Sequence, residues 1–226
     1  MADRTVLVTG GTGGLGGAVT AAFAAAGWRV VAPVRSAPGK GGDATYVTAD
    51  LNDAASVDTA VATAAGEAAA PLRAVVNLVG GYASSGLVHE TPFEDFEAML
   101  TLNLRSTYLV THAALPHLLA AGGGAVVCVS SRAALTPFAG AAGYITAKAA
   151  VLAFSNAVAA EYRQKGVRCN TLVPSVIDTP ANRAAQPDAD HSRWVQPEAI
   201  APVILHLASD ESAPTSGAAI PVYGRA

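Results

Sequence analysis

The sequence predicts a doubly wound α/β fold, in which about seven parallel strands form one sheet with helices on both faces. Short runs rich in β-branched residues alternate with alanine-rich stretches of helical length along the chain. The runs are apolar almost throughout rather than alternating, which is typical of strands buried on both faces of a parallel sheet. A chain of 226 residues that is 51% hydrophobic is large enough to bury such a core, and we expect a single domain over residues 1–226.

The strands and helices are expected in regular succession. The expected strands are Thr5–Thr9, Arg29–Val34, Thr45–Thr48, Ala74–Val79, Ala125–Val129, Val167–Val173 and Ala219–Tyr223. The expected helices lie between them at about 14–26, 53–69, 92–121, 143–165 and 197–208. Asn52 or Asp53 can cap the helix at 53–69, and Thr91 to Glu94 is interpreted as a capping box with proline at the first helical position. Glycines follow three of the helical runs as stop signals, at Gly27, Gly66 and Gly166.

A polar segment at about 180–196 interrupts the second half of the chain. A loop of that length in a compact domain usually has a function. We interpret it as a lid over a substrate site.

Composition and charge argue against several classes of protein. The 14 Lys and Arg residues against 17 Asp and Glu give a net charge of −3, which does not favour a nucleic-acid binder with a broad basic surface. Cys128 and Cys169 lie in apolar runs and are expected to be buried, reduced thiols, which favours a cytoplasmic protein. We expect no signal peptide and no metal site, because neither a leader pattern nor CxxC or HExxH spacing is present. The uncharged stretch Ser106–Ser131 is broken by Pro116 and by Gly122–Gly124, so we expect no membrane span.

The first strand leads directly into the glycine-rich segment Thr9–Gly17 and then into an alanine-rich helix. Here the backbone must turn sharply, approach a pyrophosphate closely and aim a helix N-terminus at it, and glycine does all three at low cost. The spacing fits GxGxxG through Gly11, TGxxGxxG through Gly13 and TGxxxGxG through Gly14. The segment therefore predicts a dinucleotide site, with the glycine register left open.

The second strand ends at Val34, the position where an acidic residue would bind the adenosine ribose 2′-hydroxyl. A neutral residue followed by Arg35 suits a 2′-phosphate, because a guanidinium forms charge-assisted hydrogen bonds to phosphate. The sequence therefore favours NADP over NAD.

Tyr144 precedes Lys148 by four residues at the start of an apolar helix, so the two side chains share one helix face. A phenol has a pKa of about 10, and a neighbouring cation together with a pyridinium can lower it by ~3 units. Tyr144 would then exchange a proton near pH 7. Ser131 closes the fifth strand thirteen residues before Tyr144.

These motifs, taken in order, resemble those of the short-chain dehydrogenases/reductases. The matching positions are Thr9–Gly16, Asp50-Leu51, Asn77–Gly80, Asn103, Ser131, Tyr144, Lys148 and Pro174–Thr179. The resemblance spans essentially the whole chain and implies the compact, single-domain branch with a Rossmann fold. The glycine register of that branch is TGxxxGxG, which selects Gly10, Gly14 and Gly16.

The resemblance implies hydride transfer between NAD(P) and a carbonyl or secondary alcohol. Tyr144 would be the general acid in reduction and the base in oxidation, while Lys148 would hold the nicotinamide ribose and lower the Tyr144 pKa. Ser131 would hydrogen-bond the substrate oxygen, and Asn103 would anchor a water that links Lys148 to solvent. Asp50 and Leu51 would border the adenine. The cofactor-binding set that the resemblance implies is Thr9, Gly10, Thr12, Gly14, Leu15, Gly16, Arg35, Asp50, Leu51, Asn77, Gly80, Tyr144, Lys148, Pro174, Ile177 and Thr179.

The chain departs from the family pattern at a few positions. The usual NNAG is NLVG here, with Val79 in place of alanine, and the usual Pro-Gly pair is Pro174-Ser175. Many NADP-preferring members carry a basic residue where this chain has Gly13, which counts against NADP. Bulk at Val79 and Ser175 would reshape the pocket without removing the chemistry.

A narrower resemblance concerns the substrate. Gly80–Tyr82 and the lid are similar to dihydropteridine reductases, which reduce quinonoid dihydropterin but generally lack the active-site serine that Ser131 supplies here. An alternative of a different class is a non-catalytic dinucleotide sensor, but such proteins usually lose the tyrosine or the lysine. Sugar-nucleotide epimerases share the Tyr/Lys pair but carry a larger C-terminal domain, for which no room follows Pro180.

Several side chains are expected to face a small-molecule substrate: Tyr82, Leu135, Phe138, Val176, Asn182, Arg183 and Trp194. Arg183 either attracts an anionic substrate or is a solvated loop residue, and Trp194 either faces the pocket or pins the lid to the core. The resemblance also implies a homodimer or homotetramer that packs through the helices at about 92–121 and 143–165.

Overall fold

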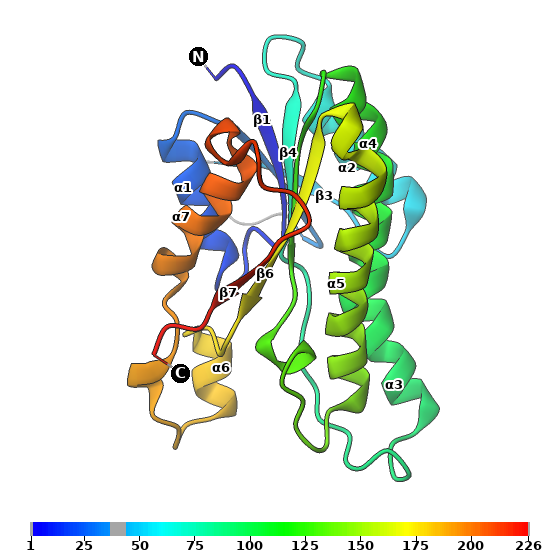
Figure 1. Cartoon of the computed structure of the whole chain (residues 1–226), viewed down its shortest axis with the longest axis vertical. Coiled ribbons are helices and arrows are strands. Elements are labelled where there is room, and N and C mark those ends of the chain that lie inside the picture. The colour runs from blue at the N-terminus through cyan, green and yellow to red at the C-terminus, as the bar shows by residue number, and fades with distance from the viewer. Residues whose placement is uncertain (1, 37–43, 226) are drawn as a thin grey trace.

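Seven parallel strands form one sheet in the order β3-β2-β1-β4-β5-β6-β7 (Figure 1). The strands are β1 Thr5–Thr9, β2 Arg29–Val34, β3 Ala44–Thr48, β4 Leu72–Asn77, β5 Gly124–Val129, β6 Val167–Pro174 and β7 Ala219–Val222. The computed structural model describes residues 2–36 and 44–225. The strand order reverses between β1 and β4, and such a switch point opens a crevice at the carboxyl edge of the sheet. The predicted fold class is confirmed.

Helices cover both faces of the sheet (Figure 1). The helices are α1 Gly16–Ala25, α2 Ala54–Ala65, α3 Phe93–Leu100, α4 Ser106–Ala120, α5 Ala142–Tyr162, α6 Pro180–Ala185 and α7 Pro197–Ala208. One core lies between the sheet and helices α1 and α7, and includes Phe23 and Ile204. The other lies beneath α2, α4 and α5, and includes Val61, Leu118 and Val151. The five inner strands are therefore buried on both faces, as their composition predicts, whereas the edge strands β3 and β7 are partly exposed.

The helix expected at 92–121 is interrupted. A π-helical turn, Thr101–Arg105, separates α3 from α4 and places Asn103 in the interior. The expected capping box is wrong, because the Thr91 hydroxyl donates to the carbonyls of Ser85 and Leu87 and caps no helix N–H. None of the helices in the described ranges is long and apolar enough to cross a membrane.

Strand β4 ends two residues earlier than expected. After Asn77, the N–H groups of Leu78 and Val79 donate to the Thr9 hydroxyl oxygen at 3.0 and 3.3 Å instead of to a neighbouring strand. Asp53 caps α2 as one of the two expected candidates, accepting the Ser56 N–H at 2.8 Å. The chain therefore leaves the sheet just where the site begins.

Candidate active site

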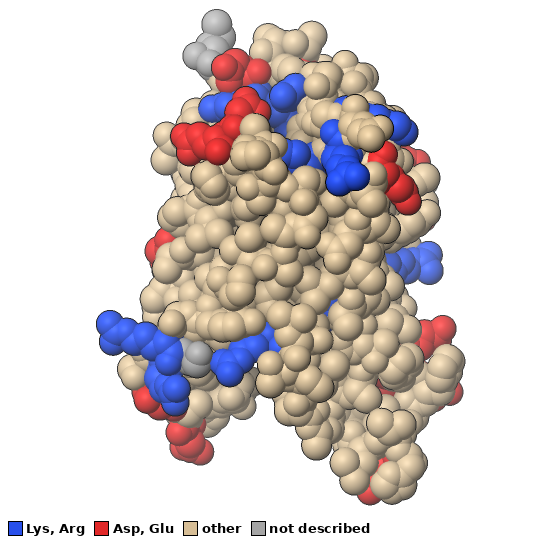
Figure 2. Space-filling model, viewed as in Figure 1, with Lys and Arg blue, Asp and Glu red and all other residues tan. Residues whose placement is uncertain are grey.

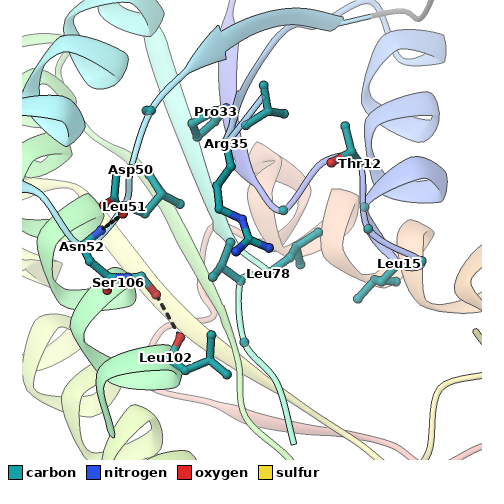
Figure 3. A pocket seen from close by; sticks show the side chains of 18 residues that line it. Thr12, Leu15, Pro33, Arg35, Asp50, Leu51, Asn52, Leu78, Leu102 and Ser106 are labelled. Atoms are coloured by element: carbon teal, nitrogen blue, oxygen red, sulfur yellow. Dashed lines mark hydrogen bonds between the residues drawn. The ribbon is translucent and has the colours of Figure 1, made fainter. Parts of the chain in front are cut away.

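A cavity of about 420 Å³ opens at the carboxyl ends of β1, β2 and β4 (Figure 3). Nine of the predicted cofactor-binding residues line it, namely Gly10, Thr12, Gly14, Leu15, Gly16, Arg35, Asp50, Leu51 and Gly80. Sequence reasoning missed Leu102 and Ser106, which also line it and sit one helical turn apart next to Asn103. The cavity lies at the switch point of strand order, where α/β sheets bind their ligands.

The glycine-rich segment folds as a tight turn in which the Gly13 N–H donates to the Gly10 carbonyl at 2.9 Å. Gly10 has a φ of +68°, which favours glycine. A Cβ at Gly16 would collide with the Gly10 carbonyl oxygen, and one at Gly14 would lie 2.6 Å from the Thr179 side chain. The glycine backbone of this turn therefore lies next to the cavity on one side and packs against Thr179, the N-cap residue of α6, on the other.

Arg35 extends from the end of β2 into the cavity, as Figure 3 shows. Among the described residues, no carboxylate forms an ion pair with it. Asp50 lies on the same rim, and its carboxylate accepts the Asn52 N–H at 2.9 Å within its own turn. The cavity wall at this end therefore presents a guanidinium.

Ser131, Tyr144 and Lys148 come together where β5 meets α5. Ser131 follows β5 and accepts the Ala133 N–H at 3.2 Å, and Tyr144 lies in the first turn of α5. Lys148, one turn further along α5, is only 6% exposed, and its ammonium donates to the Val129 carbonyl at 3.1 Å. The Lys148 Nζ lies 6.0 Å from the centroid of the Tyr144 ring. The serine, tyrosine and lysine of the motif thus share one site.

Burial dominates the electrostatics of this group. It raises the pKa of Tyr144 above its ordinary value of 10.0, while interaction with the Ser131 hydroxyl lowers that pKa by less. The lowering expected from the sequence included a pyridinium as well as the cation; in the chain alone, the loss of water around the phenol outweighs the hydrogen bond with Ser131, so the pKa is raised. Burial also lowers the pKa of Lys148 from 10.5 to about 8. At neutral pH the site holds a protonated phenol beside an ammonium group.

Asn103 clamps the backbone that follows β4. Its side-chain amide donates to the carbonyls of Gly81 and Met99, both at 3.0 Å, and its Oδ1 accepts the Gly81 N–H at 3.1 Å. Its own carbonyl accepts the Thr107 hydroxyl at 3.0 Å. The Asn103 side chain is therefore fully used by backbone groups and fixes the chain beside Lys148.

Seven predicted cofactor residues lie outside the cavity lining: Tyr144 and Lys148, described above, Thr179, which contacts Gly14, and four more. The Thr9 hydroxyl serves Leu78 and Val79, as described above, and Asn77 is buried with its amide donating to the Thr111 hydroxyl at 3.0 Å. Pro174 ends β6, and Ile177 forms a bridge with Val195. In this structure their side chains shape the floor of the site and the base of the lid rather than face the cavity.

The lid contains a short helix that the sequence does not predict. Its arginine, Arg183, forms a two-bond ion pair with Asp178, and Gln196 donates to the same carboxylate at 2.6 Å. The Arg183 guanidinium and the Gln196 amide hold the pKa of Asp178 at about 2. Trp194 is buried, with its ring centroid 4.3 Å from that of His191 within the lid. Arg183 is therefore paired within the protein, which is neither of its two expected roles, and the burial of Trp194 favours a structural role, the second of the two expected for it.

Replacing Gly80 with alanine is expected to lower the free energy of unfolding by about 1–3 kcal/mol, the usual cost of overpacking. A Cβ at this position would lie 2.6 Å from the Asn103 Oδ1 and 2.9 Å from the Lys148 Nζ, both of which are held by other bonds. Urea unfolding measures the change.

Gly17→Ala is the matched control, because nothing lies within 4 Å of its would-be Cβ inside α1. That variant is expected to be more stable than the wild type by up to about 1 kcal/mol, since alanine loses less backbone entropy on folding than glycine does. Equal stability of Gly80→Ala and the wild type would contradict the prediction, because it would show that the Asn103 amide and the Lys148 ammonium group can move away from the new Cβ.

Comparison with known proteins gives a consistent result. A family model described as short chain dehydrogenase matches residues 4–190. A 2,5-dichloro-2,5-cyclohexadiene-1,4-diol dehydrogenase of Sphingobium indicum is 35% identical over 245 aligned residues, covering 99% of this chain and 96% of that protein. The structure of a short-chain type dehydrogenase/reductase from Mycobacterium ulcerans is similar with a TM-score of 0.91 at 27% identity, covering 100% of this chain and 90% of that one. A protein described as an NAD(P)-dependent gluconate 5-dehydrogenase from Beutenbergia cavernae, solved with NADP at low occupancy, is similar with a TM-score of 0.87 at 28% identity, covering 99% and 96%.

Proposed function

This chain belongs to the short-chain dehydrogenases, and on that premise we propose that it interconverts a carbonyl and a secondary alcohol on a small molecule, with Tyr144 exchanging the proton. As a member of this family it is a nicotinamide-dependent oxidoreductase. The observation that carries the proposal is the gathering of a phenol, a hydroxyl and an ammonium group where β5 meets α5.

The residues of the cavity fit a dinucleotide. Gly14 and Gly16 let the backbone of the turn pack closely against Thr179 and Gly10, and both line the cavity at the N-terminus of α1, a position that favours a phosphate. Asp50 and Leu51 would border the adenine, and Arg35 would meet its ribose. When bound, the nicotinamide donates or accepts the hydride, and the protein supplies orientation, a proton and electrostatics.

The roles proposed for the side chains follow from their protonation states. Tyr144 holds its proton at neutral pH and donates it to a carbonyl oxygen that Ser131 positions. Lys148, with a pKa of about 8, is mostly charged at pH 7 and would hold the nicotinamide ribose hydroxyls. Asn103 keeps the backbone at Gly81 in register beside this ammonium group.

The proposed activity is tested by following NADPH and NADH oxidation over a panel of carbonyl compounds that includes quinonoid dihydropterin. Turnover of simple ketones supports the proposal, and turnover of the pterin alone would identify a dihydropteridine reductase. Cofactor binding without turnover of any carbonyl would instead favour a dinucleotide sensor.

We further propose that the cofactor is NADP rather than NAD. The support is Arg35 in the cavity wall, the uncharged Val34 before it, and the NADP bound by the Beutenbergia relative. Replacing Arg35 with alanine is expected to weaken NADPH binding by roughly tenfold or more, because charge-assisted hydrogen bonds are worth about 1.5–3 kcal/mol. NADH affinity is expected to change by less than about threefold, since NADH has no 2′-phosphate for the guanidinium to bind.

Fluorescence titration with the two cofactors measures the difference. Arg163→Ala removes the same charge at the opposite edge of the sheet and serves as the control. Parallel losses for NADPH and NADH in Arg35→Ala would contradict a 2′-phosphate contact.

We also propose one catalytic domain, a homo-oligomer and a cytoplasmic setting. The half-exposed Tyr108 of α4 packs against His112 of the same helix and Phe154 of α5. These three rings offer an aromatic surface to a second copy of the chain. The two cysteines, Cys128 and Cys169, are free thiols, as a reducing compartment would leave them.

A further inference from the structure

Two aromatic side chains stand open to solvent beside the proton-exchanging phenol. Tyr82 meets the Tyr144 ring edge-on, with centroids 5.1 Å apart and planes at 89°. Phe138 lies 6.4 Å from Tyr82. Tyr82 is 55% exposed and Phe138 is 50% exposed, so each presents a large apolar surface next to the reacting group. Exposed aromatic surface of this kind, beside a polar reacting group, is typical of a ligand-binding wall.

The wall is held in place from both sides. Before Tyr82, both backbone groups of Gly81 are bonded to the Asn103 side chain. After it, the Ser84 hydroxyl and the Ser85 N–H donate to the Gly140 carbonyl at 2.7 and 3.1 Å. These bonds join the loop after β4 to the loop before α5, which carries Phe138. Because these loops are already ordered, less conformational entropy is lost when a ligand binds to the wall.

Three arginines near the wall already contact other groups of the protein. Arg183 is paired with Asp178, whose side chain is only 4% exposed, so an anion that displaced it would leave a buried carboxylate unpaired. The Arg132 guanidinium lies over the Tyr223 ring at 5.2 Å, and the Arg193 Nε donates to the Arg225 carbonyl. In Figure 2, the lower right lobe, where Figure 1 places α3, shows acidic atoms but no basic ones. Within the described part of the chain, no lysine or arginine lies over the ring of Tyr82 or Phe138, so the wall itself presents an apolar surface and no cation.

We infer that Tyr82, together with Phe138, selects an uncharged carbonyl compound with an apolar ring, which packs against this wall while its oxygen reaches Ser131 and Tyr144. The inference rests on the proposed function, because it concerns the substrate of the same site. Tyr82 is the specificity-determining residue, since it contacts both Phe138 and the Tyr144 ring. A carboxylate or phosphate on the substrate would lose its water without gaining a partner.

The test compares two ketones of the same shape, neutral acetophenone and anionic 4-acetylbenzoate. Their affinities are measured by ligand-observed NMR on the full chain saturated with NADP, which binds in the oxidised form and so leaves both ketones intact. NADPH oxidation then gives KM and kcat for each compound. The wild type is expected to bind acetophenone at least about tenfold more tightly, because a desolvated carboxylate without a partner is costly.

Three variants locate the effect. Tyr82→Ala is expected to raise the KM for acetophenone by roughly tenfold with kcat within about threefold, the pattern of lost ground-state binding. Tyr82→Phe keeps the ring and is expected to keep the preference. Val88→Ala alters another exposed apolar residue of the same loop, 75% exposed, and is expected to change neither value.

The outcomes separate the two proposals. Equal binding of the two ketones by the wild type, no measurable binding of acetophenone, or an unchanged preference in Tyr82→Ala would overturn the inference. Preferential binding of acetophenone that depends on Tyr82, without hydride transfer to either ketone, would support the wall and overturn the proposed interconversion of ketones and secondary alcohols.

Discussion

Replacing Tyr144 with phenylalanine will lower carbonyl turnover by roughly 10²–10⁴-fold, the range that general acid catalysis contributes. Phenylalanine keeps the ring that packs against Tyr82 and loses only the hydroxyl that carries the proton. Cofactor affinity will stay within about twofold, because Tyr144 is not among the residues that line the dinucleotide cavity. Steady-state NADPH oxidation and a cofactor titration together measure both effects.

Tyr108→Phe is the matched control, because it removes another phenol from a half-exposed ring on α4, outside the site. It should leave turnover unchanged. Turnover by Tyr144→Phe at the wild-type rate would remove the proposed proton donor. The pH profile adds a second check: the pKa of Tyr144 is raised, so reduction persists through neutral pH, whereas alcohol oxidation needs the phenolate and rises toward alkaline pH.

The parts of the site that follow from local pattern were predictable from the sequence. A strand that runs into Thr9–Gly17 and then into a helix has few ways to fold, and the cavity lies against this loop. Tyr144 and Lys148 are one helical turn apart, so a helix alone brings them to one face. The apolar composition of the seven strand segments likewise predicts a parallel sheet that is covered on both faces.

The remaining features depend on partners distant in the sequence. The π-helical turn forms where Asn103 bonds Gly81, 22 positions earlier, and nothing in the local pattern from 92 to 121 marks that position. Asp178, five residues before Arg183, was an available signal for the lid ion pair, but opposite charges at that spacing are common on solvated loops. The direction of the Tyr144 pKa shift depends on burial, which only the folded structure reveals.

Replacing Lys148 with methionine will stabilise the protein at pH 7 while abolishing its activity. Burial lowers the pKa of Lys148 from 10.5 to about 8, a difference that corresponds to about 3 kcal/mol of unfavourable free energy for burying the ammonium. Methionine has similar length and no charge, and its loss of the hydrogen bond to Val129 costs about 1 kcal/mol. A net gain of about 2 kcal/mol is expected, as when buried charges are replaced by apolar groups of similar volume.

The pH dependence identifies the cause of that gain. Between pH 8 and pH 10.5 the unfolded chain binds more protons at Lys148 than the folded chain does, so wild-type stability at this position rises with pH. Methionine cannot titrate, and the stability gap between the two proteins should therefore shrink across this window, reach zero at about pH 9.5 and reverse above it, where only the Lys148 hydrogen bond to Val129 still separates them. Other groups titrate in both proteins and cancel in the difference. Urea unfolding of both proteins at pH 7 and pH 10 measures it.

Lys165→Met is the matched control, because this exposed lysine only rests over the Tyr162 ring at 5.0 Å. Its stability should change by less than about 0.5 kcal/mol, as for most surface substitutions. A Lys148→Met variant that is less stable than the wild type at pH 7, or a gap that does not vary with pH, would mean that the ammonium is well solvated within the fold. A gain that does narrow with pH would show that the protein gives up stability to keep a charged group beside Tyr144, a trade that function alone explains.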